Sequence, residues 1–144
     1  MRLEISLSGL SDGKFADFYE SDVANALEEG VSEAGAIILN RIRKRFLAQE
    51  SPDGVPWEPS FAAFKRSFSG RDGGTLFDTG TLFHSIQLFS VSPLEKAIAT
   101  DVPYAPYHQY GVGKLPVREF LGFSDDDFAL ASAVLLKKIK EAFP

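Results

Sequence analysis

The 144-residue chain contains no cysteine, and this excludes several kinds of site. Without a thiol there is no disulfide scaffold, cysteine nucleophile, thiolate-bound zinc or iron–sulfur cluster. The sequence also lacks any apolar run near the roughly 20 residues that span a membrane. The first residues, Met1 to Ser8, alternate polar and apolar side chains, so we expect neither a signal peptide nor a membrane partner.

An excess of positive charge is lacking too. The chain has 15 Lys and Arg residues against 20 Asp and Glu residues, a net charge of −5. Phosphate binding needs clustered cations, so this balance disfavours a dedicated nucleic-acid-binding protein. One basic cluster, Arg41 to Arg45, with Lys65, Arg66 and Arg71 further along, keeps a small nucleic-acid-binding module as an alternative. A solvated face that complements the helix dipole explains the cluster more simply.

Hydrophobic residues make up 44% of the chain and charged residues 24%, which indicates one globular domain over residues 1–144. Alternation predicts a strand from Arg2 to Leu7. A single apolar stripe with helical spacing predicts a long helix over about 22–48, and the stripe comprises Val23, Leu27, Val31, Ala34, Ile38, Ile42 and Phe46. Small residues, Gly30 and Gly35 among them, predict that another element packs very close to this helix.

Residues 49–80 carry loop signals, because proline and glycine recur and no long period is present. Ser60 is placed to cap a short helix bearing Phe61, Phe64 and Phe68. A connection this long with so little regular structure is generally functional or disordered. We therefore expect residues 49–80 to form a protruding loop or arm.

The second half of the chain predicts short strands and a final helix. Residues 85–91 and 96–100 form a predicted hairpin, and residues 115–120 a further strand. Ser124 followed by Asp125-Asp126-Asp127 begins a helix with a hydroxyl cap and acids in its first turn. The predicted fold class is α+β, with a long N-terminal helix and a C-terminal helix packed on a small, mostly antiparallel sheet.

Few residues suggest chemistry. Asp78-Thr79-Gly80 is the triplet of aspartic proteases, so a homodimeric protease sharing one proton between two copies of Asp78 is an alternative function. A turn with glycine before the hairpin is the simpler interpretation. His84 and His108 lie in no metal-binding pattern, and the acids at 125–127 lack the spacing of a calcium loop. We expect no metal, no cofactor and no catalytic residue.

The apolar content of the predicted arm points instead to contact with something. Trp57 stands in a proline-rich loop, where it is either a lid over the core or an anchor for a neighbouring chain. Phe61 and Phe64 follow it, and together these rings exceed what a solvated loop carries. We predict that Trp57, Phe61 and Phe64 lie at a subunit interface.

Four blocks of sequence in a fixed order resemble the phage virion morphogenesis family, which comprises tail-completion proteins of Mu-like and other tailed phages and prophages. The blocks cover roughly residues 40 to 124 and are Ser51-Pro52-Asp53-Gly54-Val55-Pro56-Trp57, then Leu76 with Thr79-Gly80-Thr81-Leu82 and Ser85-Ile86, then Thr100 with Tyr104-Ala105 and Tyr107-His108-Gln109-Tyr110-Gly111, and last Pro116-Val117-Arg118-Glu119-Phe120-Leu121-Gly122. In the last block Glu119 stands where the family often has proline.

The resemblance implies a structural protein that is not an enzyme and acts in tail completion and head–tail joining. It further implies a homo-oligomeric ring at the phage neck, partners among other neck, tail-tube or portal-adaptor proteins, and location in the virion after assembly in the host cytoplasm. DNA is expected to pass through such a ring without specific binding. Within the last block, we expect Arg118 to pair with a carboxylate, to fix residues 116–122 and to lie near a subunit interface.

Overall fold

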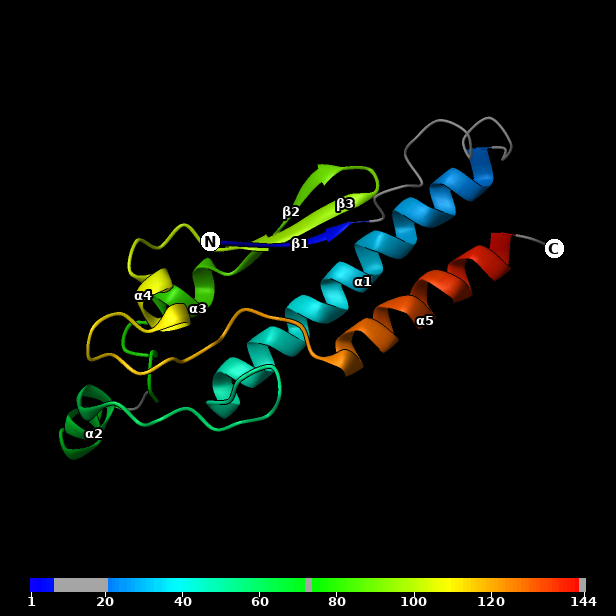
Figure 1. Ribbon diagram of the computed structural model, residues 1–144. Coiled ribbons are helices and arrows are strands. Elements are labelled where there is room, and N and C mark those ends of the chain that lie inside the picture. Colours follow the sequence, from blue (N-terminus) through cyan, green and yellow to red (C-terminus); the bar gives the residue numbers. More distant parts are fainter. Residues whose placement is uncertain (7–20, 72–73, 143–144) are drawn as a thin grey trace.

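The computed structural model describes residues 1–6, 21–71 and 74–142. Within them the fold is α+β, as predicted. The helix α1 (Ser21–Ala48) lies between a small sheet on one side and the helix α5 (Asp125–Ala142) on the other, which runs antiparallel to it (Figure 1). Leu7, the expected end of the first strand, lies outside the described residues.

The long helix α1 buries the stripe that its period predicted. Val31, Ile38, Ile42 and Phe46 are buried, with Ile42 and Phe46 completely enclosed. The small residues of α1 lie where other elements approach most closely. A Cβ on Gly30 would come within 3.0 Å of Leu135 in α5, and a Cβ on Gly35 within 3.0 Å of Leu88 in the sheet. Close approach on both sides of α1 is therefore confirmed.

The sheet has three antiparallel strands, β1 (Arg2–Ser6), β2 (Gln87–Ser92) and β3 (Glu95–Ala99), in the order β1-β3-β2. The hairpin of β2 and β3 was predicted. Ile98 of the central strand pairs with Leu3 on one side and Leu88 on the other, and it is fully buried. β2 is an edge strand and mostly exposed.

The segment between α1 and the sheet divides into a packed part and an exposed part. Residues 50 and 56 form a β-bridge that turns the chain back, and Trp57 enters the core. The side chain of Gln49 then bonds both backbone groups of Thr75, and the hydroxyl of Thr75 accepts the backbone N–H of Ser60. These bonds close the segment at its base. Beyond the base, α2 (Phe61–Phe68) is set apart from the long helices and the sheet (Figure 1).

One predicted element is wrong and two were not predicted. Residues 115–120 form no strand, because Pro116 has no N–H and the amides of Phe120 and Leu121 both donate to the side chain of Gln109 instead of to a neighbouring strand. The short helices α3 (Thr81–Ser85) and α4 (Ala105–Tyr110) were missed. Each is too short for its apolar period to be visible in the sequence.

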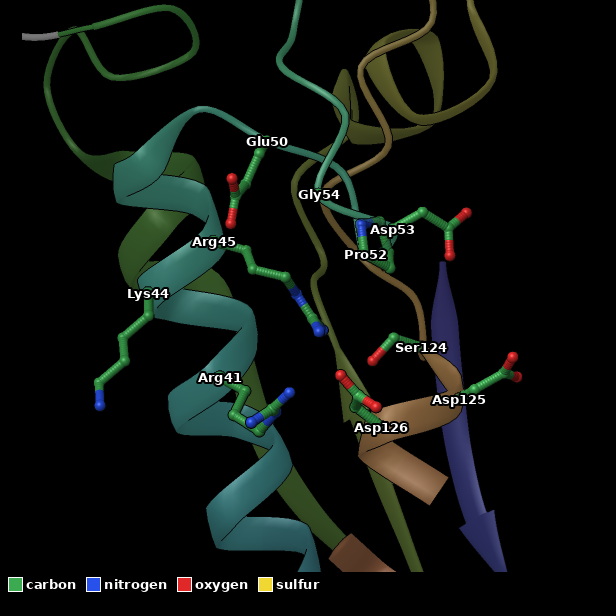
Figure 2. A pocket seen from close by; sticks show the side chains of 10 residues that line it. All are labelled: Arg41, Lys44, Arg45, Glu50, Pro52, Asp53, Gly54, Ser124, Asp125 and Asp126. Carbon is green, nitrogen blue, oxygen red and sulfur yellow. The ribbon is translucent and has the colours of Figure 1, made fainter. Parts of the chain in front are cut away.

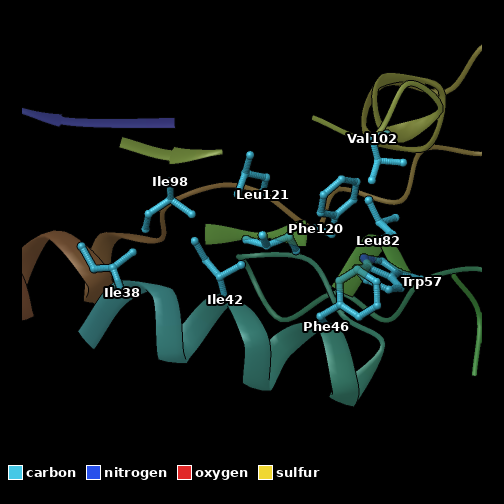
Figure 3. Close-up of a cluster of buried hydrophobic side chains, with 11 residues drawn as sticks. Ile38, Ile42, Phe46, Trp57, Leu82, Ile98, Val102, Phe120 and Leu121 are labelled. Atoms are coloured by element: carbon cyan, nitrogen blue, oxygen red, sulfur yellow. The ribbon is translucent and has the colours of Figure 1, made fainter. Parts of the chain in front are cut away.

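The core lies where α1, the base of the arm and the sheet meet, and Figure 3 shows its side chains. Phe46 contacts Trp57, Phe83 and Phe120 edge-on at ring-centroid distances of 5.3, 5.5 and 5.8 Å. Edge-to-face geometry of this kind adds about 0.5–1.5 kcal/mol per pair beyond the burial of apolar area. The aromatic cluster thus fixes the end of the molecule from which α2 extends.

Candidate docking surface

The four sequence blocks meet in one place, and hydrogen bonds join them. The indole N–H of Trp57 donates to the carbonyl oxygen of Glu119 at 3.0 Å. The Nε of Arg118 donates to the carbonyl oxygen of Glu58, the residue after the first block, at 2.8 Å, so the last block is bound at two neighbouring points of the chain. The hydroxyls of Ser85 and Thr100 are 2.6 Å apart and join the second block to the third.

Gln109 joins the third block to the last. Its side-chain oxygen accepts the amides of Phe120 and Leu121, each at 3.1 Å, and its Nε2 donates to the carbonyl oxygen of Leu121 at 2.6 Å. One buried side chain therefore provides the hydrogen bonds that a neighbouring strand would otherwise give to the backbone of residues 120–121. Through these bonds the four blocks stabilise the end of the molecule that carries α3 and α4.

A buried carboxylate fixes the start of α5 against α1. Asp127 is fully buried and accepts hydrogen bonds from Arg41 and, at 2.7 Å, from Arg45. It also accepts the backbone N–H of Ser124, whose hydroxyl accepts that of Asp127 in return, a reciprocal helix cap. Burial raises the pKa of Asp127, but the bonds from Ser124, Arg45 and Arg41 outweigh it and hold the pKa below the ordinary 3.8.

The basic cluster of α1 is thus largely engaged within the fold. Figure 2 shows Arg41 and Arg45 directed toward the start of α5 across a cavity of about 490 Å³, while Lys44 extends away. Arg43 donates to the carbonyl oxygen of Ile86 at 3.0 Å. The cavity also carries Asp125 and Asp126, which repel phosphate. This arrangement gives the nucleic-acid-binding alternative little support.

An exposed aromatic face covers α2. Phe61, Phe64 and Phe68 are 71%, 57% and 78% exposed, and no residue of the helix is buried. The rings contact one another, with centroids 6.4 Å apart for the first pair and 4.9 Å for the second. Lys65 lies 5.1 Å over the Phe61 ring. We call the three phenylalanines the aromatic face.

Further apolar surface lies near α4. Tyr104, Tyr107 and Tyr110 are 43%, 51% and 66% exposed, and Val117 is 61% exposed. Aromatic residues, tyrosine above all, are enriched in protein–protein interfaces. Two exposed aromatic groups thus lie on elements whose positions depend on the joined sequence blocks.

Between α2, α3 and α4 lies a pocket of about 710 Å³. Apolar residues form much of its lining, and its titratable residues are Glu58, Arg66, Asp78, His108 and Arg118. The carboxylate of Asp78 is held by Arg71 at 3.1 Å and lies 3.8 Å from Arg66. Burial, and after it the charge of Arg118, lowers the pKa of His108 below 6.5, so its imidazole is neutral at pH 7.

Two predicted interface residues are buried in the chain's own fold. Trp57 is 6% exposed and Arg118 is 4% exposed. Arg118 fixes residues 116–122, as expected, but through the backbone oxygen of Glu58; no carboxylate among residues 1–6, 21–71 and 74–142 lies within ion-pair distance of it. Phe61 and Phe64 are exposed, as an interface residue requires. The sequence did not predict that Gln109 binds the backbone of residues 120–121 or that Asp127 binds Arg41 and Arg45. A local pattern does not indicate which distant residue will be the partner.

Asp78, the basis of the protease alternative, is 52% exposed at its side chain and bound by arginine. No group of three His, Asp or Glu residues in the described part of the chain is placed to hold a metal ion. The same residues include no helix that is both long and apolar enough to cross a membrane.

A sequence model of the phage virion morphogenesis family matches residues 21–140. No curated protein and no solved structure matches the chain. The family match extends beyond the four sequence blocks into both long helices. The chain therefore belongs to the phage virion morphogenesis family and has a structural role in the assembly of a phage virion.

Proposed function

We propose that this protein completes the phage tail and joins it to the head as a homo-oligomeric ring at the neck, and that it is not an enzyme. The observation that carries the proposal is the aromatic face, borne by a helix without a single buried residue in a virion-assembly protein. A monomer gains nothing from three exposed phenylalanines on one short helix. A subunit that must contact another chain does.

In the proposed ring, α2 of each copy lies against a different face of the next copy. Such a contact, repeated by rotation, closes a ring. Burying a fully exposed phenylalanine contributes about 1.5–3 kcal/mol. The three rings are 57–78% exposed, so the aromatic face supplies about 3–6 kcal/mol per contact. Association itself costs about 4–15 kcal/mol. The tyrosine surface of α4 or other virion proteins must therefore add to the contact, which fits a subunit that assembles beside a head or tail partner.

The remaining parts of the proposal follow from charge and location. A ring around the DNA path should bind phosphate weakly, and a net charge of −5 favours this. Its proposed partners are other neck, tail-tube or portal-adaptor proteins. The proposed location is the neck of the virion, reached from the host cytoplasm during assembly. Asp78, held by arginines, then serves the turn before α3 and not catalysis.

The test replaces Phe64 and Phe68 together by serine, and the control replaces Phe128, which is 60% exposed on α5. Sedimentation velocity over a concentration series measures assembly, and circular dichroism checks folding. We expect the wild type and Phe128→Ser to form a closed oligomer and the α2 double variant to remain monomeric. A wild type that is monomeric at all concentrations, alone and with virion proteins, would contradict the proposal.

A further inference from the structure

Arg118 has hydrogen-bonding capacity that its own chain leaves unused. Its Nε donates to the carbonyl oxygen of Glu58, and this is the one hydrogen bond that its side chain makes within residues 1–6, 21–71 and 74–142. Only 4% of the residue is exposed, and it lines the 710 Å³ pocket. Neither Nη atom is among the fully buried side-chain atoms without a partner, so both reach the solvent that fills the pocket. A guanidinium has five N–H donors and keeps its charge, so these donors are open to an anion that enters the pocket.

The surroundings of Arg118 do not supply that anion. Asp78 is engaged by Arg71 and Arg66, and the carboxylate of Glu58 is not within ion-pair distance of Arg118. His108 does not compete for an anion at pH 7, because it is neutral there, and its Nδ1 is buried without a hydrogen-bond partner. Among the described residues, the Nη groups of Arg118 and the Nδ1 of His108 therefore have no hydrogen-bond partner.

We propose that this pocket receives the carboxylate of an Asp or Glu side chain from a second copy of the chain, which binds the Nη groups of Arg118. A planar guanidinium fork matches a carboxylate at two points. The apolar lining, which includes Leu76, Leu82, Tyr104 and Leu115, suits the methylene part of such a side chain.

The choice of a second copy follows from charge and position, and it rests on the proposed function. The chain carries five more acids than bases. Exposed acids such as Glu28 belong to the first half of α1, whereas the pocket lies between α2, α3 and α4, beyond the last turn of α1 (Figure 1). A rotational contact brings different faces of two copies together, so an acid far from the pocket can enter the pocket of the next copy. Phe61 of the aromatic face lines the same pocket, so both contacts involve one neighbour.

The first experiment tests the pocket without depending on assembly. The Phe64→Ser/Phe68→Ser protein, whose substituted residues do not line the pocket, is titrated with propionate, which has the size of a glutamate side chain. Propionamide, the neutral analogue, and chloride at equal ionic strength are the controls. We expect propionate alone to shift the NMR signals of the Arg118 Nε–H and the His108 ring, and Arg118→Gln to abolish the saturable shift. Equal shifts with propionate, propionamide and chloride would overturn the proposal that the pocket binds a carboxylate.

The second experiment tests the occupant in wild-type protein. We expect propionate, but not propionamide, to dissociate the oligomer seen in sedimentation velocity, and Arg118→Gln to raise the dissociation constant about tenfold or more. Arg118→Lys, which keeps the charge but not the fork, should lie between. If propionate binds but does not affect assembly, the proposal that a second copy supplies the carboxylate is overturned. If the wild type does not assemble but propionate binds, the ring fails while the carboxylate site stands.

Discussion

Replacing Asp127 by asparagine should remove a large share of the protein's stability, because the change leaves a buried arginine without its anion. Asp127 is completely enclosed, and Arg45, which binds it at 2.7 Å, is 9% exposed. Removing one partner of a buried ion pair costs about 3–5 kcal/mol. Arg41 keeps 35% of its side chain exposed and can turn to water, so the lower end of that range applies. We expect Asp127→Asn to lower the free energy of unfolding by about 3 kcal/mol.

The pH dependence gives a second, independent measure of the same contact. The folded pKa of Asp127 is lower than the ordinary 3.8, so the unfolded chain binds the proton more readily. The stabilisation is complete above pH 3.8 and is lost as the pH falls below it, through the folded pKa. On acidification, the free energy of unfolding of the wild type should therefore fall more than that of Asp127→Asn. The difference between the two free energies should become smaller.

Urea unfolding at several pH values, at one low protein concentration, measures both effects. Asp126→Asn is the matched control, because this acid lies in the same helical turn but is exposed. Its free energy of unfolding should stay within about 0.5 kcal/mol of the wild type. An Asp127→Asn protein as stable as the control, or a gap that does not change from neutral to acid pH, would refute the reasoning.

Two further substitutions test close packing and the hydrogen bonds of the last sequence block. Gly35→Val should destabilise the protein by about 1–3 kcal/mol more than Ala36→Val, because a side chain at 35 collides with Leu88 while position 36 faces solvent; thermal or urea unfolding measures this, and equal losses would contradict it. Gln109→Met should cost about 3 kcal/mol by leaving buried backbone groups unpaired, whereas Gln87→Met, at an exposed position, should cost less than about 1 kcal/mol; similar values for the two would show that the buried amide does not hold residues 120–121.

The long elements were predictable because they repeat one rule many times. The apolar stripe of α1 recurs from Val23 to Phe46 in a helix of 28 residues, and the cap and acids of α5 mark the start of that helix. The hairpin shows alternation on both sides of a turn. The segment after α4 offered no such repetition. Its backbone groups bond the side chain of Gln109 and the carbonyl of His108, and these partners depend on the tertiary fold.

The candidate surface was predictable only in part, for the same reason. A high aromatic content for a loop identifies residues 49–80 as an arm that makes contacts. It does not indicate which of the rings are buried. Trp57 packs against Phe46 because the β-bridge between residues 50 and 56 turns the chain back toward the end of α1. Phe61 and Phe64 lie beyond the base formed by Thr75 and remain outside. The pairing of Arg41 and Arg45 with Asp127 likewise spans more than 80 positions, beyond the reach of local pattern.

What the fold uses internally limits what a partner can contact. Most of the sequence blocks that resemble the family stabilise one end of the molecule through internal hydrogen bonds. These bonds are made by Trp57, Gln109 and the Nε of Arg118. Residues occupied in this way are not free for recognition. The groups left over are the aromatic face of α2, the exposed tyrosines at α4 and the Nη groups of Arg118. One member of each group, Phe61, Tyr104 and Arg118, lines the same pocket. The resemblance therefore identifies a scaffold, and the surface that the scaffold leaves unsatisfied is where a neighbouring subunit should bind.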